Sequence, residues 1–238
     1  MSKKIVLLIP DRLSNDVISF TDDSRNIILI TRRMNFLAHI YLSGDNPKVK
    51  VGNFMADSIR GKKYEAYPED YKIGILLHRA IDTFTDSHPT VRKSTKKLHA
   101  NYSHYSGVIV DIFYDHFLAK NWQDYSKIPL DVYADEFYDL LREHYHILPM
   151  NVKRMMPYLI ADNWLLSYAK LEGISKVLNG MNRRTQNRSK MNYATEDLKE
   201  HYSEFESEFI SFFEELRVFS SIQLQKLTQL NTKSPLDI

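Results

Sequence analysis

The C-terminal part of the chain carries the pattern that most restricts the possible fold. Between residues 195 and 230, apolar side chains recur at alternating spacings of four and three residues. They are Leu198, Tyr202, Phe205, Phe209, Phe212, Leu216 and Phe219. This heptad spacing predicts one long helix with a continuous apolar face. We expect that face to pack against the body of the same domain; a coiled coil between two chains is the alternative.

The rest of the chain has the composition of a helical globular domain. Its 238 residues are 43% hydrophobic and 26% charged, which is typical of a folded chain with a sizeable core. Only 7 glycines and 8 prolines are present, so turns are few and the elements are long. We therefore predict a single all-α domain. The formal net charge of +2 is too small to indicate nucleic-acid binding.

Cysteine is absent from the sequence, which excludes disulfides and thiolate metal sites. A bound metal must therefore be held by His, Asp and Glu. No apolar run approaches the ~18 residues of a membrane-spanning helix. We predict a cytoplasmic protein with no membrane partner.

Residues 1–33 differ from the rest of the chain. Short apolar runs rich in β-branched residues at 5–9 and 27–30 predict two strands, separated by polar sequence without helical periodicity. The alternative is that the native protein starts at Met34, with the preceding segment an upstream extension. The predicted domain division is therefore an extension at 1–33 and a helical domain at 34–238.

From Met34 onward the apolar periodicity is helical. We predict helices over 34–42, about 49–60, 68–87, 90–99, 105–122 and from Pro129 to before Pro149. A further helical stretch covers 151–179 with an interruption near Gly173, and a polar turn is predicted at 180–184.

Two of these helices place ionisable groups among apolar neighbours. His78 and Asp82 are four residues apart in the third helix, and Asp111 and Asp115 have the same spacing in the fifth. Residues at this spacing share one helix face, so each pair can converge on one cation. Packed face to face, the two rows would suit Mn²⁺, Fe²⁺, Mg²⁺ or Zn²⁺, with the carboxylates favouring the harder ions. Buried ion pairs and caps are the alternative. The neighbouring His116 is a candidate ligand, general acid or supporting group.

Several separated motifs resemble the acyl carrier protein phosphodiesterase family. They are MNFLAH at 34–39, GNFMADSIRG at 52–61, HRAID at 78–82, DIFYDHFL at 111–118 and LNGM at 178–181. The resemblance runs in order from Met34 to about Phe213.

The resemblance implies an all-helical fold distantly similar to HD-domain phosphohydrolases. It also implies a Mn²⁺-dependent enzyme, with Mg²⁺ or Fe²⁺ as alternatives, that removes 4′-phosphopantetheine from holo-acyl carrier protein. One feature departs from HD domains: the His-Asp doublet is absent at His78, and the adjacent pair Asp115-His116 has the reverse order.

With the resemblance, further residues join the predicted site. The predicted metal ligands are His39, Asp57, His78, Asp82 and Asp111. Asp115 and His116 are predicted to handle protons or orient ligands, and Arg79 to steady the phosphate. Because acyl carrier proteins are acidic, the basic residues near Lys62 and Arg92 become candidates for docking the substrate.

Two rival functions fit the same residues. One is an HD-like phosphohydrolase acting on a nucleotide or another small phosphodiester. The other is a non-catalytic helical adaptor that uses the long aromatic helix for docking. The sequence leaves the oligomeric state open.

Overall fold

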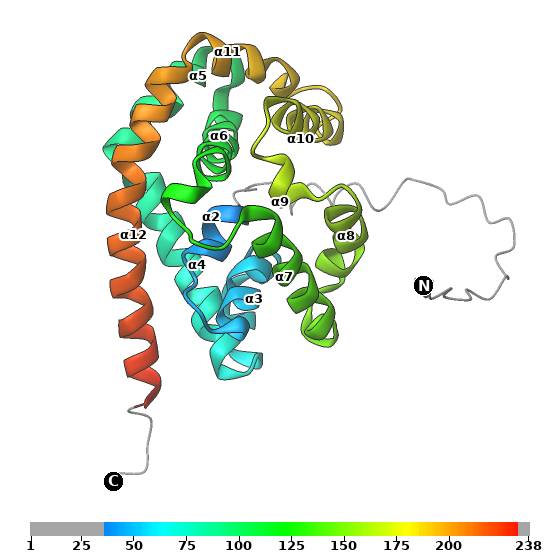
Figure 1. The fold of residues 1–238 in the computed structure, drawn as a ribbon, viewed down its shortest axis with the longest axis vertical. Coiled ribbons are helices and arrows are strands. Elements are labelled where there is room, and N and C mark those ends of the chain that lie inside the picture. The colour runs from blue at the N-terminus through cyan, green and yellow to red at the C-terminus, as the bar shows by residue number, and fades with distance from the viewer. Residues whose placement is uncertain (1–35, 233–238) are drawn as a thin grey trace, which may run out of the picture.

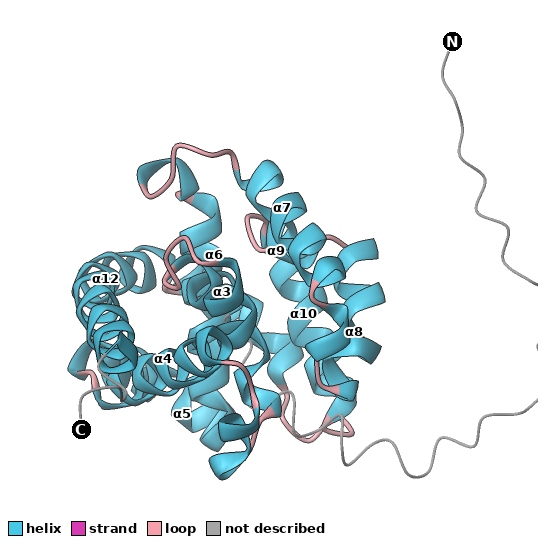
Figure 2. Ribbon diagram, turned by 90° about the horizontal axis from the view of Figure 1, so that it is seen from below, coloured by secondary structure: helices cyan, strands magenta, loops and turns pink. Residues whose placement is uncertain are grey.

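The computed structural model describes residues 36–232 of the chain. The predicted extension at 1–33, its two strands and the alternative start at Met34 lie outside these residues. Within them the predicted all-α fold class is confirmed, and Figure 2 shows helices joined by loops. The larger helices are α2 (Phe36–Tyr41), α3 (Pro47–Met55), α4 (Glu69–Ser87), α5 (Pro89–Tyr102), α6 (Ser106–Lys120), α7 (Leu130–Glu143), α8 (Met150–Ala161), α9 (Trp164–Ser167), α10 (Leu171–Arg184), α11 (Ala194–Glu200) and α12 (Tyr202–Thr232).

Helix α4, which carries His78 and Asp82, has nearly the predicted bounds. It begins directly after Pro68, with Glu69 and Asp70 in its first turn, where the helix dipole favours negative charge. It ends at Ser87 because the next helix begins at Pro89, and the residue before a proline disfavours helical geometry.

The predicted polar turn at 180–184 is wrong, because these residues form the last part of α10. Ile174, Leu178 and Met181 recur at helical spacing on its buried face, and this apolar contact continues the helix through the polar sequence. The predicted interruption near Gly173 is present, because α9 ends at Ser167 and α10 begins at Leu171, after Lys170 in an extended conformation. A second break lies earlier. Helix α8 ends at Ala161, and Asn163 adopts a left-handed backbone with a φ of 42° before α9 begins.

The long C-terminal helix packs against its own domain, as predicted. His201 separates α11 from α12, so the predicted single helix is two. Phe205 and Phe209 are fully buried and lie against the aromatic rings of α6, with ring centroids 5.2 Å apart for Phe113–Phe205 and 5.6 Å for Tyr114–Phe209. In Figure 1, α12 runs along one whole side of the molecule.

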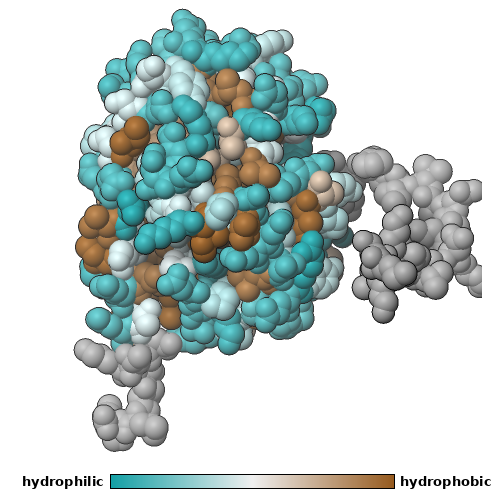
Figure 3. Space-filling view, in the orientation of Figure 1, coloured by the Kyte–Doolittle hydropathy of each residue, from teal (hydrophilic) through white to brown (hydrophobic). Residues whose placement is uncertain are grey.

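The face of the molecule drawn in Figure 3 is mostly hydrophilic. On the face drawn in Figure 3, hydrophobic residues form separate patches among mostly hydrophilic ones. No helix among the described residues combines the length and apolarity needed to cross a membrane.

Helices α3 and α4 approach each other unusually closely. A Cβ atom on Gly74 would lie 2.2 Å from the Val49 carbonyl oxygen, and one on Gly52 would lie 2.4 Å from the Tyr71 carbonyl oxygen. Such distances leave no room for a side chain, so both positions require glycine. This contact places Asn53 of α3 beside His78 of α4.

A buried carboxylate fixes the beginning of α2. The backbone N–H groups of Leu37 and Ala38 donate to the two oxygens of Asp115 at 3.0 and 2.9 Å. Asp115 belongs to α6 and has no exposed surface. A side-chain carboxyl group at a helix N-terminus can satisfy N–H groups that have no partner within the helix. Asp115 therefore ties α2 to α6.

The close contact of α3 and α4 predicts a large effect of one methyl group. We expect Gly74→Ala to lower the free energy of unfolding by about 1–3 kcal/mol, because the added Cβ meets backbone atoms that cannot move independently. Denaturant titration measures the change. Gly180→Ala in α10 is the matched control: nothing lies within 4 Å of its added Cβ, so its stability should be unchanged or slightly raised. Equal effects of the two variants would contradict the argument.

The buried Asp115 predicts a pH-dependent stability. Burial raises the pKa of its carboxyl to about 8, against the opposing effect of the Ala38 and Leu37 N–H groups. The folded protein thus holds this proton more tightly than the unfolded chain, whose Asp pKa is about 4. The stability that the raised pKa contributes is complete below about pH 4 and is lost as the pH rises towards 8.

Asp115→Asn removes this titration. We expect the variant to be less stable than wild type at about pH 5, with a smaller deficit at about pH 8.5, as measured by urea unfolding at both pH values. A deficit of the same size at both pH values would contradict the raised pKa.

Candidate metal centre

Three predicted site residues lie close together. His39 on α2 and His78 and Asp82 on α4 each offer a ligand atom, and these atoms lie within 4.8 Å of one another. The Asp82 oxygens lie 3.4 Å from His39 Nε2 and 3.4 Å from His78 Nε2. The two imidazole rings stack with centroids 4.0 Å apart.

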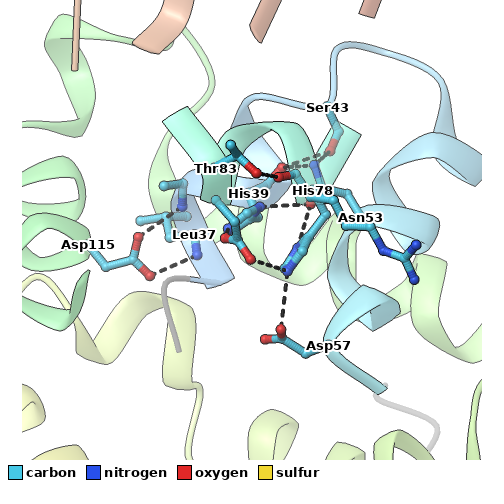
Figure 4. A network of polar contacts seen from close by, with 11 residues as sticks. Leu37, His39, Ser43, Asn53, Asp57, His78, Thr83 and Asp115 are labelled. Carbon is cyan, nitrogen blue, oxygen red and sulfur yellow. Dashed lines mark hydrogen bonds and ion pairs between the residues drawn. The ribbon is translucent and has the colours of Figure 1, made fainter. Parts of the chain in front are cut away.

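Asp57 contacts His78 from the short helical turn after α3, η1 (Ala56–Ser58). Its Oδ1 lies 3.2 Å from His78 Nε2, and Figure 4 shows this contact as a dashed line below the His78 ring. The side chains of Asp57 and Asp82 are 24% and 17% exposed, whereas those of His39 and His78 are almost fully buried. The cluster is therefore reached from its carboxylate side.

Asn53, whose role the sequence did not reveal, contacts both histidines. Its Oδ1 lies 2.8 Å from His39 Nδ1 and 3.1 Å from His78 Nδ1. Its amide nitrogen donates to the His39 carbonyl oxygen at 3.1 Å and to Ser43 Oγ at 2.9 Å. The only signal in the sequence is an amide among apolar residues in the motif that also carries Asp57.

The charges in the cluster support a positive ion. Burial and the neighbouring His78 lower the pKa of His39, with Asp82 opposing them. For His78, burial opposes protonation, but Asp57 and Asp82 outweigh it and raise the pKa to about 9. Burial likewise opposes ionisation of Asp82, yet the facing imidazoles hold the pKa of this carboxyl well below its usual range. The two carboxylates thus favour positive charge next to His78 Nε2.

One buried atom indicates that a cation fits here. Nε2 of His39 has no hydrogen-bond partner among the described residues, although Asp82 is 3.4 Å away. Buried polar atoms normally have a partner, so an unpaired imidazole nitrogen next to a carboxylate is unusual. Two imidazoles with carboxylate oxygens form a donor set that divalent metals accept. The residues present therefore fit a divalent ion.

The structure does not bring Asp111 to this cluster. Asp111 lines a separate surface pocket of about 610 Å³ with Asp86 at the end of α4, Arg92 and Lys96 of α5, and other residues of α5 and α6. The two predicted rows do not face each other, because α2 lies between them: Asp115 contacts its first backbone N–H groups, and His39 reaches from it to Asp82.

His116 and Arg79 are engaged elsewhere. The His116 ring lies 2.8 Å through Nδ1 from the Tyr168 carbonyl oxygen and 2.9 Å through Nε2 from the Tyr202 hydroxyl. Arg79 Nη2 donates to the carbonyl oxygens of Ile59 and Gly61, at 2.9 and 2.8 Å. The predicted contact of Arg79 with a phosphate stays a prediction.

Comparison with known proteins places the chain in a family. A family model described as acyl carrier protein phosphodiesterase matches residues 34–216. A protein named acyl carrier protein phosphodiesterase from Photorhabdus laumondii subsp. laumondii is 33% identical over 181 residues, which cover 76% of this chain and 91% of the relative.

Further relatives carry the same name. One from Yersinia pestis is 31% identical over 181 residues, and one from Escherichia coli O157:H7 is 33% identical over 183 residues; both alignments cover 76% of this chain and 94% of the relative. No solved structure matches the chain, so the similarity to HD-domain phosphohydrolases stays a prediction.

Proposed function

The chain belongs to the acyl carrier protein phosphodiesterase family, and we propose that the cluster of His39, His78 and Asp82 is its catalytic centre. The reaction is hydrolysis of the phosphodiester between 4′-phosphopantetheine and a serine of holo-acyl carrier protein. Water adds to phosphorus, and the serine oxygen leaves and takes up a proton. The products are apo-acyl carrier protein and 4′-phosphopantetheine. The observation that carries the proposal is the unpaired, buried Nε2 of His39 facing Asp82 within a family of phosphodiesterases.

His39, His78 and Asp82 would hold a divalent ion, with Asp57 at the open side as a fourth ligand. A bound divalent metal lowers the pKa of water and polarises a phosphoryl oxygen. The mixed nitrogen and oxygen donors suit Mn²⁺, and Mg²⁺ or Fe²⁺ are alternatives.

The protein's own groups would orient the reaction. Asp57 and Asp82 are the partly exposed members of the cluster, so the phosphodiester approaches along them. Asp57 Oδ1 lies 3.2 Å from His78 Nε2. Its second carboxylate oxygen would be available to take a proton from the attacking water. The buried rings of His39 and His78 keep the opposite side free of solvent. We leave Asp111, Asp115 and His116 out of the reacting groups, because their contacts lie elsewhere. The cytoplasm remains the proposed compartment on the composition argument.

Purified holo-acyl carrier protein tests this function. With added Mn²⁺ we expect its mass to fall by one phosphopantetheine group, and Asp82→Ala to abolish the change because the central carboxylate is lost. Mass spectrometry with and without chelator gives the measurement. Asp111→Ala is the control and should keep its activity, since Asp111 lies in a different pocket. An unchanged carrier protein together with turnover of nucleotides would favour the rival phosphohydrolase. No turnover and no bound metal would favour the adaptor.

We also propose a docking surface for the acidic carrier protein beside the metal centre. The short helical segment η2 (Gly61–Ala66) follows Asp57 and carries exposed Lys62 and Lys63, with exposed Arg60 just before it. Arg79, the neighbour of His78, holds this segment in place through the carbonyl oxygens of Ile59 and Gly61.

The predicted basic cluster near Arg92 is a weaker candidate for docking the carrier protein, because acidic residues partly neutralise its charges. Lys93 and Lys97 pair with Glu208 at 3.1 and 2.8 Å, and Lys97 also pairs with Glu204 at 2.7 Å. Opposite charges at these distances reduce the attraction that the lysines exert on an acidic partner.

Charge reversal tests the docking surface. We expect Lys62→Glu to raise KM for holo-carrier protein roughly three- to tenfold with kcat unchanged, a difference of about 1 kcal/mol that shrinks at high salt. Steady-state kinetics at two salt concentrations gives the measurement. Lys226→Glu, at another exposed lysine near the C-terminal end of α12, is the matched control and should leave KM unchanged. Equal KM values for both variants would contradict docking at η2.

A further inference from the structure

The amide of Asn53 has only one possible orientation. One end faces the carbonyl oxygen of His39, at 3.1 Å. A carbonyl oxygen accepts hydrogen bonds and cannot donate, so the amide nitrogen must lie at that end. Ser43 Oγ donates its own hydrogen to the same carbonyl at 2.7 Å, which leaves its lone pairs to accept from Asn53. The amide oxygen must therefore face the two imidazole rings.

This orientation determines where the hydrogens of both rings lie. An amide oxygen only accepts, and Asn53 Oδ1 lies within hydrogen-bond distance of Nδ1 of His39 and of His78. Both Nδ1 atoms must then carry a hydrogen and donate it. In a neutral imidazole with its hydrogen on Nδ1, Nε2 carries the free lone pair. Both Nε2 atoms face Asp82.

We infer that Asn53 is the positioning residue of the metal centre: its one side-chain oxygen sets the tautomer and the ring direction of both histidine ligands. This rests on the proposed metal-dependent function. Protein metal ligands commonly depend on such supporting hydrogen bonds, which usually serve one imidazole each. Here a single amide serves two rings on different helices, α2 and α4.

The surroundings make the arrangement rigid. Asn53 and Ser43 have no exposed surface, so no water competes for the amide. The two hydrogens of the amide nitrogen and both lone pairs of its oxygen are all used. A rotation that lost any of these bonds would leave a buried polar group unpaired, which is costly.

Metal affinity tests the inference. We expect Asn53→Leu, which has a similar size and no polar atoms, to weaken binding of Mn²⁺ alone about 10- to 100-fold in calorimetric titration. Asn53→Asp keeps an acceptor for both Nδ1–H groups and should bind Mn²⁺ more tightly than Asn53→Leu. Ser43→Ala is the control: it removes one bond of the amide nitrogen without touching either ring, so its loss should be the smallest.

Nitrogen NMR of the histidine rings gives a second readout that a merely structural role would not change. In metal-free wild type at about pH 8, we expect the neutral ring of His39 to carry its hydrogen on Nδ1. In Asn53→Leu the hydrogen should move to Nε2, next to Asp82. A wild-type His39 protonated on Nε2 overturns the inference, as does a folded Asn53→Leu protein with unchanged Mn²⁺ affinity. If Asn53→Leu does not fold, the wild-type spectrum alone decides.

Failure of this inference is distinguishable from failure of the proposed function. If wild-type protein cleaves holo-carrier protein with Mn²⁺ and Asn53→Leu binds Mn²⁺ normally, the proposed function stands and the positioning role of Asn53 is wrong. If wild-type protein binds Mn²⁺ and shows the Nδ1 tautomer but does not cleave the carrier protein, the positioning role of Asn53 stands and the proposed substrate is wrong.

Discussion

The close approach of α3 and α4 is the contact on which the proposed metal centre depends. Each helix carries a glycine where the two backbones come closest, and a methyl group on Gly52 or Gly74 would meet backbone atoms at 2.4 or 2.2 Å. The residue after Gly52 is Asn53, and one helical turn after Gly74 lies His78. The glycines therefore do more than permit packing: they bring an amide on one helix within 3.1 Å of an imidazole on the next.

The two histidines can be buried next to each other because their surroundings shift their pKa values in opposite directions. Two stacked imidazoles that both carried charge would repel each other, and burial would add a desolvation cost. The structure separates their roles: the pKa of His39 is lowered, and that of His78 is raised by Asp57 and Asp82. A single divalent ion accepting both Nε2 atoms would satisfy the carboxylates and the unpaired His39 nitrogen together. Buried carboxylates and imidazoles of this kind cluster at functional sites more often than elsewhere.

Local spacing allowed the helices and half of the cluster to be predicted, but not the packing between helices. His78 and Asp82 share a face of α4 because four residues make about one turn, and this holds whatever surrounds the helix. Asp111 and Asp115 obey the same rule, yet which side of α6 faces α4 depends on the packing of a helix whose residues are mostly buried. The short α2 occupies the space between them. The role of Asn53 could not be predicted from the sequence, because it depends on contacts among residues 39, 53 and 78, which come from three helices.

The position of α2 shows how Asp115, in the second predicted row, contributes to the proposed metal centre. Asp115 holds the first N–H groups of α2, and His39 follows one residue after Ala38. Further along α2, the carbonyl oxygen of His39 accepts hydrogen bonds from Asn53 and Ser43. The six residues of α2 are too few to form a stable helix alone, so these contacts from α6 and α3 decide where the His39 ring points. Asp115 lies outside the cluster but thereby acts on it through the backbone of α2. This accounts for two acidic rows in the sequence, although the structure places only the row of His78 and Asp82 at the proposed metal centre.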